Sequence, residues 1–572
     1  MAKRLLRLCA SLLFLWFVAV AQEKPSPTTK PRPDGPTVVV APPDALPKAS
    51  DQDSTARSPQ ALPKFELQQF VITGAASIDL PDVEKVESSE PVRVPELVNP
   101  LDASRDRSTV DFLSDQKEMF VQEAKAARSG RVQGSAGTYL SSRFGLWLIS
   151  REAGNFLFGD LQYGTSRAYV PSANRSEGHF SVTGGMTLHG PSEWYDRGML
   201  KGELDYGSKT YRFYGSLTPT VTRTASRFDI SAEYSSPKEL GSDYSGQVGM
   251  SVAGINDSST SATESRFDVG AGYGFLLGSV PFDGHLGLSL ASTTGSGEGT
   301  LPFLDVGLKT HRLWFGSLFV QGAGKFFLTQ GMLGQKLARI YPQAEIGYCF
   351  LETTTASVAY QGRVQLNSLN ELLQAHPYVA ATSTIRQSDV PIDLLAVVET
   401  GWSESLRTRL SARYQSIRDY PLFTEGAGKG FWTTAYAGTT NLSTLQADLF
   451  AKFAANSYFV VSLAVNSSKN TATGLKIPYV PDVQLDAGLS LEVASRLRIL
   501  PTLSAVGHRM PDLYATEALK AYLLLGLRGE YSAANWFNVF VDVQNLTDSN
   551  YDGWNGYRAT PFVASVGMSV RW

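Results

Sequence analysis

The chain is poor in the residues that most often build covalent, catalytic and metal-binding sites. Its 572 residues include two cysteines and six histidines. Because Cys9 lies in a segment that we expect to be removed, Cys349 has no second cysteine with which to form an internal disulfide. The histidines are scattered, and no phosphate-binding loop or nucleotide fingerprint is present. We therefore expect no enzyme, no metal site and no cofactor, and a net charge of −3 gives no sign of nucleic-acid binding.

The chain also lacks a long apolar run. No stretch reaches the roughly 18 consecutive apolar residues that predict a transmembrane helix, and the mean hydropathy is −0.11. A shorter apolar segment from Leu8 to Val20 follows Lys3 and Arg4 and is itself followed by Ala21. Basic residues, a short apolar core and small residues in this order predict a secretory signal peptide over residues 1–21, cleaved after Ala21, rather than a membrane anchor.

The segment that follows is rich in proline and acidic residues. Residues 22–107 have too little apolar surface to form a core, so we expect an extended periplasmic linker. Residues 108–130 carry the clearest helix signal: Ser108 is a plausible N-cap with Asp111 three positions later, and Gly130 can end the helix. We expect this short helix at the periplasmic mouth of the domain that follows.

From about residue 131 to residue 572, apolar and polar residues alternate. Residues 483–493 and 537–543 show the pattern clearly. Side chains on a β-strand point to opposite faces at each step, so these strands have one apolar and one polar face. A soluble sandwich would explain a few of them, but about twenty long strands with charges on the second face fit a closed barrel whose apolar side meets lipid. We predict an all-β membrane protein, a large antiparallel barrel of about 22 strands.

The polar face of these strands should line the lumen of the barrel. The residues that we predict there are Arg407, Arg409, Arg413, Asp482, Asp486, Glu492, Arg528 and Asp542. Tyrosine and tryptophan near strand ends fit the girdles at the two membrane interfaces. Trp147, Trp314, Trp432 and Trp536 are the tryptophans assigned to these girdles.

The end of the chain resembles known outer-membrane barrels. Residues 562–572 alternate and finish on an aromatic residue, and Gly567, Val570 and Trp572 resemble the signal that the barrel-assembly machinery recognises. Residues 543–557, with Asn545-Leu546-Thr547-Asp548, resemble the closing hairpin of TonB-dependent receptors. Residues 368–378, 477–482 and 506–509 resemble other segments of that family. The resemblance implies an outer-membrane barrel of a Gram-negative bacterium, with both termini in the periplasm.

The N-terminal region departs from that family. Its members fill the lumen with a plug domain, and a short upstream strand pairs with TonB. Phe70, Val71, Ile72 and Thr73 form a strand-like patch that resembles this TonB box, with an incidental apolar patch as the alternative. Too few residues lie between this patch and the barrel for a plug, so the plug is expected to be absent.

A barrel of this size needs something to occlude it, because its diameter grows with strand number. Inward-folded loops, the helix of residues 108–130, a separate partner and deformation of the barrel all remain open. One hypothesis is that residues 75–130 partly fill the periplasmic mouth, with a tether outside the barrel as the alternative.

Two functions follow from these expectations. The first is a channel or receptor related to TonB-dependent transporters that moves or admits a small solute. The second is a scaffold barrel that anchors a periplasmic partner through its N-terminal arm. In both cases the expected partners are outer-membrane lipid, the barrel-assembly machinery, and TonB or another periplasmic protein.

Overall fold

The computed structural model describes residues 128–572 except 153, 168, 193–194, 238–242, 259, 296–298, 352, 404, 427 and 455–456. The predicted signal peptide, linker and TonB-box-like patch, and nearly all of the predicted helix, lie outside these residues. Among the described residues, no helix is long and apolar enough to cross a membrane.

Long strands account for most of the described chain. They are β1 (Arg128–Gly137), β2 (Ser141–Glu152), β3 (Asn155–Ser166), β4 (Arg175–Thr187), β5 (Met199–Arg212), β6 (Thr222–Ser235), β7 (Tyr244–Asp257), β8 (Ser261–Leu277), β9 (Val280–Gly295), β10 (Gly299–Thr310), β12 (Leu318–Gln330), β13 (Lys336–Leu351), β14 (Thr354–Gln361), β16 (Ser388–Ser403), β17 (Leu406–Arg418), β20 (Thr439–Ala454), β21 (Ser457–Asn470), β22 (Val483–Ala494), β23 (Leu497–Val506), β24 (Tyr522–Ala534), β25 (Phe537–Gln544) and β28 (Val563–Arg571).

Shorter elements extend or connect these strands. β11 (Leu313–Phe315) and β15 (Arg363–Gln365) continue β10 and β14, while β18 (Leu422–Glu425) pairs with β19 (Trp432–Ala435) and β26 (Asp552–Trp554) with β27 (Tyr557–Arg558). The helical elements are α4 (Leu369–Ala375) and the 3-10 turns η1 (Thr138–Leu140) and η3 (Met332–Gly334).

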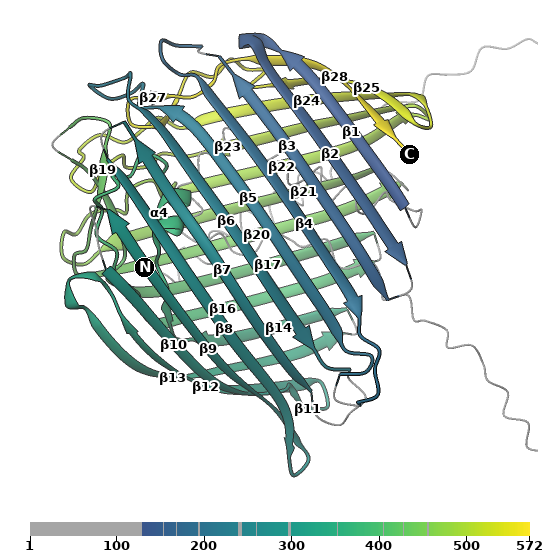
Figure 1. Cartoon of the computed structure of the whole chain (residues 1–572), viewed down its shortest axis with the longest axis vertical. Helices are drawn as coiled ribbons and strands as arrows, with labels where there is room; N and C mark the ends of the chain where they lie inside the picture. The colour runs from purple at the N-terminus through teal and green to yellow at the C-terminus, as the bar shows by residue number, and fades with distance from the viewer. Residues whose placement is uncertain are drawn as a thin grey trace, which may run out of the picture. The chain divides into compact units, whose positions relative to one another are not determined.

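The strands close into one antiparallel barrel. Each strand pairs with its neighbour in the chain, and β28 pairs with β1 from Arg131 opposite Arg571 to Gly137 opposite Ser565. With β11 and β15 taken as continuations, the barrel has 22 strands (Figure 1). Closure leaves no unpaired edge, which backbone groups in a bilayer require. The predicted fold class and strand number are confirmed.

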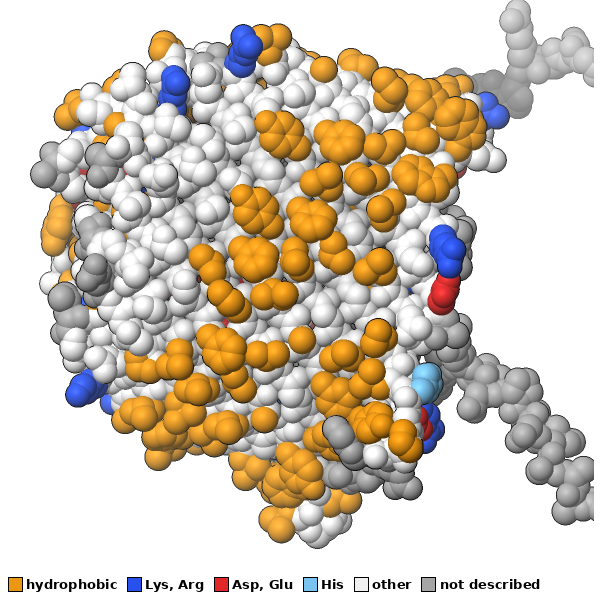
Figure 2. Space-filling model, in the orientation of Figure 1, with side chains coloured by type: hydrophobic (Ala, Val, Ile, Leu, Met, Phe, Trp, Pro, Cys, Tyr) orange, Lys and Arg blue, Asp and Glu red, His pale blue; other side chains and the backbone are white. Residues whose placement is uncertain are grey.

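The outer surface of the barrel is apolar. Figure 2 shows apolar side chains spread in a broad band across the strands. On β17, for example, Leu410 and Tyr414 are 50% and 38% exposed, whereas Ser411 and Gln415 on the other face are buried. Large apolar side chains exposed in this number are unfavourable in water and favourable in lipid, so this band is the membrane-spanning surface.

Two of the four tryptophans assigned to the interfacial girdles are exposed at strand ends, and the other two are buried. Trp314 and Trp536 lie at strand ends and are 54% and 59% exposed. Trp147 and Trp432 are 1% and 0% exposed, so their placement in the girdle was wrong. Trp147 shares the inner face of β2 with its polar residues, and Trp432 belongs to a loop hairpin, which a pattern of strand ends does not reveal.

The first strand begins earlier than predicted. β1 starts at Arg128, so it includes Gly130, which was expected to end the preceding helix. Gly130 and Trp572 exchange two backbone hydrogen bonds, with N···O distances of 2.9 and 3.0 Å. The neighbouring strand therefore satisfies the backbone groups that a helix would have used, and strand pairing determines this boundary.

The connections differ between the two ends of the barrel. We call the end with Arg128 and Trp572 the terminal mouth and the other end the loop mouth. Several terminal-mouth connections, such as 278–279, 495–496 and 535–536, join adjacent strands directly, whereas residues 366–387, 419–438, 507–521 and 545–562 form long loops at the loop mouth. These long loops form most of the site described below.

The residues of the predicted assembly signal lie on the closing strand. A Cβ atom on Gly567 would lie 2.2 Å from Cζ of Phe540, so the ring of the neighbouring strand needs a glycine here. Val570 pairs with Val132 and with Phe537. Trp572 is 62% exposed at the terminal mouth. Recognition of these residues by the assembly machinery stays a prediction.

Candidate functional site: a loop cap at one mouth

Six connections at the loop mouth pack against one another and against the barrel wall. We call them the loop cap: residues 213–221, 366–387, 419–438, 471–482, 507–521 and 545–562. Their apolar side chains and those of the adjoining strands form the largest buried cluster of the described barrel. Figure 1 shows α4, which belongs to the cap, between the front and rear walls near the loop mouth. The cap is an example of inward-folded loops, one of the arrangements considered above for occlusion.

The centre of the cap is aromatic. Tyr378 stacks on Tyr557 with ring centroids 3.6 Å apart, and His376 lies 3.9 Å from Trp554 and 4.5 Å from Trp432. All five side chains are at most 8% exposed. Buried tyrosine and tryptophan side chains each bury roughly 150–250 Å², so their packing makes an aromatic core in the cap.

Backbone contacts join the cap loops to one another. Val379 and Trp432 form a parallel bridge, and the N–H of Ala380 donates to the carbonyl of Trp432 at 2.6 Å. The hydroxyl of Tyr557 donates to the carbonyl of Gly430 at 2.8 Å. Gly430 has a φ of 86° and approaches a neighbouring loop closely, which explains a glycine at this point. The loops therefore form one packed body.

His376 is a buried neutral side chain of this core. Burial, followed by the charge of Arg223, holds the pKa of His376 well below its usual range. Its Nδ1 accepts a hydrogen bond from the N–H of Tyr378 at 3.3 Å, so the proton of the neutral ring is on Nε2. The side chain is a packing element rather than a proton carrier at neutral pH.

A buried ion pair ties the cap to the far wall. Arg223 on β6 binds Asp257 on β7 through two hydrogen bonds of 2.7 Å, and its third nitrogen donates to the carbonyls of Pro377 and Val379 at 2.8 and 2.7 Å. The guanidinium carbon also lies 4.7 Å from the ring centroid of Phe213. The Arg223 side chain is 0% exposed. We call Arg223 and Asp257 the latch pair.

The latch pair binds a loop whose own strands lie in another part of the barrel wall. Loop 366–387 leaves the wall at β15 and returns at β16, yet the carbonyls that it offers to Arg223 meet β6. The loop therefore crosses the bore instead of folding back on its own strands. Tyr211 of β5 supports the same contact, because its hydroxyl donates to the carbonyl of Pro377 at 2.6 Å.

A second contact holds α4 against β8. Ser368 caps the helix by accepting from the N–H of Glu371 at 3.3 Å, and Glu264 of β8 accepts from the N–H of Leu369 at 2.8 Å. Arg266 lies 3.8 Å from the carboxylate of Glu371. Burial, with the nearby Glu264 charge, raises the pKa of Glu371 to about 7 although Arg266 opposes the change. The charge of this side chain therefore changes near neutral pH.

Three of the four arginines predicted to line the lumen lie on β17. Arg407, Arg409 and Arg413 share the face opposite the exposed Leu410. Arg413 binds Asp393 of β16 through hydrogen bonds of 2.8 and 2.6 Å. This arginine therefore belongs to an ion pair between two adjacent strands of the wall.

The other predicted lumenal residues are distributed unevenly. Arg528 and Asp542 are buried and stand opposite each other on β24 and β25. Asp486 accepts from Ser504 at 2.7 Å. Asp482 instead precedes β22 in a cap loop, where it binds Lys476 at 2.7 Å and is 42% exposed. Glu492 is exposed near the terminal end of β22.

Sequence reasoning did not single out the latch pair. Arg223 and Asp257 are isolated charges at strand ends, and no local pattern marks them. It did single out much of the cap: residues 368–378, 477–482 and 545–557 carry the family resemblance, and all three segments meet in the cap. Within the described residues there is no group of three His, Cys, Asp or Glu side chains able to hold a metal ion.

No family model matches the chain, and no curated protein matches it. Solved structures do match. The FrpB iron transporter from Neisseria meningitidis (F3-3 variant) superposes with a TM-score of 0.61 at 10% identity, over 80% of this chain and 83% of that chain. The siderophore receptor PiuA from Acinetobacter baumannii gives 0.61 at 10% identity, over 78% and 82%. The copper transporter OprC gives 0.58 at 12% identity, over 78% and 80%.

At these identities the likeness shows the fold alone. The described barrel has the fold of the 22-strand barrels of TonB-dependent receptors, as the C-terminal motifs predict. A barrel of this fold with an apolar outer band is of the outer-membrane type. The predicted absence of a plug concerns residues that lie outside the described part of the chain.

Proposed function

We propose that the chain is an outer-membrane receptor or channel of the TonB-dependent type, which admits a small solute when the loop cap leaves the bore. The observation that carries this proposal is the crossing of the bore by loop 366–387, held on the far wall by the latch pair. Gln365 and Ser388, at the two ends of this loop, are directly paired on adjacent strands. The loop can therefore move while the sheet of the barrel stays intact.

The proposed orientation places the terminal mouth in the periplasm and the loop cap outside the cell. Short connections at the terminal mouth and long loops at the other agree with the usual arrangement of bacterial barrels. Residues 22–107, with the TonB-box-like patch Phe70–Thr73, then lie on the side where TonB or another periplasmic protein can bind them. Outer-membrane lipid surrounds the apolar band, and the assembly machinery binds the closing strand.

Solute flux tests this function. Purified full-length barrels are reconstituted in planar bilayers and in liposomes, and single-channel openings and swelling in neutral solutes are recorded. Transport predicts rare openings that become frequent when the latch pair is broken. The scaffold alternative predicts no flux in either protein, together with a periplasmic partner whose co-purification depends on residues 22–107.

The N-terminal segment is a competing explanation for occlusion. If residues 75–130 partly fill the terminal mouth, deletion of residues 75–127, the part that precedes β1, raises the single-channel conductance of an otherwise intact chain. If the loop cap closes the bore, this deletion leaves the conductance unchanged. Heat-dependent migration on SDS gels checks that the shortened barrel is folded.

A further inference from the structure

We propose that the outer face of the barrel beside the loop mouth binds the neutral sugar headgroups of a glycolipid in the surrounding leaflet. The surface lies on β2 to β10, between the apolar band and the loop mouth. Figure 2 shows it as the pale, uncharged area to the left of the apolar band. The proposal goes beyond transport and rests on the proposed orientation, which places the loop mouth outside the cell.

A row of aromatic side chains marks the loop-mouth edge of the apolar band on these strands. Phe144, Tyr163, Phe180, Tyr206 and Phe267 are 42%, 51%, 39%, 43% and 45% exposed. The row passes from strand to strand, because Phe144 pairs with Tyr163 and Phe180 pairs with Tyr206. Aromatic girdles of barrels lie at the boundary between hydrocarbon and headgroups. The outer face beyond the row therefore lies at the level of the headgroups.

The outer face beyond this row consists mainly of hydroxyl side chains. Outward positions alternate along each strand, so the exposed apolar residues of the same strand identify them. We call these serines and threonines the hydroxyl belt: Ser142, Thr165, Ser176, Ser208, Thr210, Thr222, Thr224, Ser226, Ser261, Thr263, Ser265, Ser292, Thr294 and Thr300. The other outward positions of this region are Gly178, Arg212, Gly254 and Asn256.

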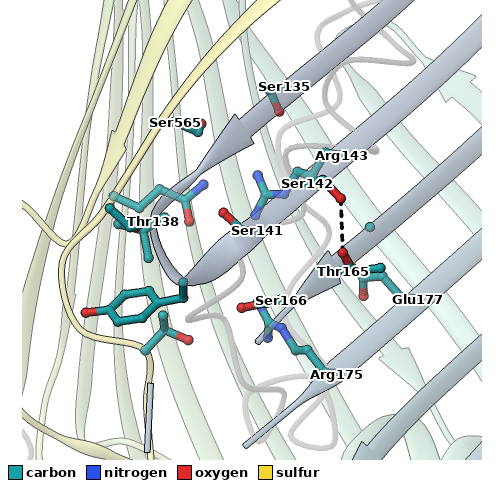
Figure 3. Close-up of a pocket in the computed structure, with 15 residues that line it drawn as sticks. Ser135, Thr138, Ser141, Ser142, Arg143, Thr165, Ser166, Arg175, Glu177 and Ser565 are labelled. Carbon is teal, nitrogen blue, oxygen red and sulfur yellow. Dashed lines mark hydrogen bonds between the residues drawn. The ribbon is translucent and has the colours of Figure 1, made fainter. Parts of the chain in front are cut away.

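Belt residues on adjacent strands stand side by side. The hydroxyls of Ser142 and Thr165 lie 3.0 Å apart, and Figure 3 shows this contact. Those of Thr210 and Thr224, which are directly paired on β5 and β6, lie 3.2 Å apart. Each hydroxyl both donates and accepts hydrogen bonds. The belt therefore offers donors and acceptors together, as the hydroxyls of a sugar require.

The belt is uncharged although the same strands carry many charges on their inner face. The inward positions between the belt residues include Arg143, Arg175, Glu177, Lys209, Arg223, Arg227, Asp257, Glu264 and Arg266. Surfaces that meet only water are typically about 25–35% charged, whereas Arg212 is the one charged residue among the described outward positions of this region. Anionic headgroups would favour lysine and arginine here. A neutral partner that forms hydrogen bonds explains the composition.

The belt is also deeper than the headgroup of an ordinary phospholipid. On β8, Ser261 lies six positions from Phe267. At roughly 3.3 Å per residue and a strand tilt of roughly 40°, this segment rises about 15 Å beyond the aromatic row. Phospholipid headgroups occupy only about 5–8 Å on each side of a bilayer. A headgroup of several sugar units is needed to cover the whole belt.

Lipid selection by the full-length protein tests the belt. The barrel is placed in phosphatidylcholine nanodiscs that contain equal small shares of galactosylceramide, lactosylceramide, globotriaosylceramide and phosphatidylglycerol. Native mass spectrometry counts the lipids that stay bound after release. Enrichment over the bulk share should rise with the number of sugars and reach about fivefold to tenfold for globotriaosylceramide. Anionic phosphatidylglycerol should not be enriched.

Two matched double variants locate the binding surface. Thr210→Val with Thr224→Val removes two belt hydroxyls at nearly constant shape, and valine is favourable in strands. This change should lower the enrichment of globotriaosylceramide about threefold. Thr354→Val with Thr400→Val is the control, because these directly paired hydroxyls lie 3.4 Å apart at the terminal end of β14 and β16, outside the belt. The control should select lipids as the wild type does, and heat-dependent migration on SDS gels checks that both variants are folded.

The inference is overturned if no glycolipid is enriched, if phosphatidylglycerol is enriched more than globotriaosylceramide, or if the control lowers the enrichment as much as the belt variant does. A barrel that conducts when the latch pair is broken but does not select glycolipid contradicts only this inference. A barrel that selects glycolipid but never conducts contradicts only the proposed transport.

Discussion

Breaking the latch pair should open the mouth without unfolding the barrel. Arg223→Met leaves the carboxylate of Asp257, with 6% of its side chain exposed, facing the apolar cap without its partner. It also removes one donor from each of two backbone carbonyls of loop 366–387, at 2.8 and 2.7 Å, of which the Pro377 carbonyl keeps Tyr211 as a donor. Removal of one member of a buried pair typically costs about 3–5 kcal/mol. In the open state water solvates Asp257, so most of this free energy destabilises the closed state of the cap relative to the open state.

The expected effect on gating follows from this free energy. Each 1.4 kcal/mol changes an equilibrium about tenfold, so Arg223→Met should raise the ratio of open to closed channels by about 10²- to 10³-fold. Single-channel recording in planar bilayers measures this ratio as the open probability. Swelling of liposomes in a neutral solute should accelerate in parallel.

Arg227→Met is the matched control for this experiment. Arg227 lies on the same strand and pairs with Asp229, but its side chain is 43% exposed. An exposed pair contributes only about 0–1 kcal/mol, so this variant should open as rarely as the wild type. The reasoning is refuted if folded Arg223→Met barrels have the open probability of Arg227→Met barrels.

Three further predictions address the cap and the closing strand. The pKa of Glu371 is raised to about 7 in the docked helix, so docking is strongest at low pH and weakens as pH rises toward 7; open probability should increase from pH 5 to 8, and Glu371→Gln should reduce the change, because burial also raises the pKa of the neighbouring Glu264. Gly567→Ala places a Cβ 2.2 Å from the ring of Phe540 and should destabilise the barrel by about 1–3 kcal/mol, seen as a lower transition temperature on heat-modified SDS gels, whereas Gly529→Ala, with open space around its Cβ, should not. Asn545→Ala removes a side chain that accepts from one turn amide at 2.9 Å and donates to a turn carbonyl at 3.0 Å, and should speed proteolysis of the last cap loop while the barrel stays resistant.

The barrel was predictable because a local signal repeats along the chain. Each strand alternates apolar and polar residues, so residues 483–493 alone indicate one face for lipid and one for the interior. Neighbouring strands pair in sequence order, and counting them is enough to obtain the architecture. The pattern misplaced Trp147 because its alternation identifies two faces, and a large aromatic residue fits either of them.

The cap was less predictable because its contacts are made between distant segments. Arg223 donates to the carbonyl of Pro377 across the bore. The residues next to either one in the sequence give no indication of this contact. The family-like segments at 368–378 and 545–557 indicated which stretches matter, but their meeting in one aromatic core depends on the closed barrel. Asp482 was assigned to the lumen because the alternation of β22 continues into the preceding loop. The residue lies in that cap loop, where it binds Lys476.

The most direct test of the closed loop mouth is removal of the loop that crosses it. Because Gln365 and Ser388 are paired neighbours, residues 367–386 can be replaced by a short Gly/Ser turn without altering the barrel. Single-channel conductance is then compared among this variant, the full chain and a chain lacking residues 75–127. Closure by the cap predicts long-lived conductance only where residues 367–386 are absent; a silent barrel in that variant, with steady conductance on deletion of residues 75–127, would contradict it.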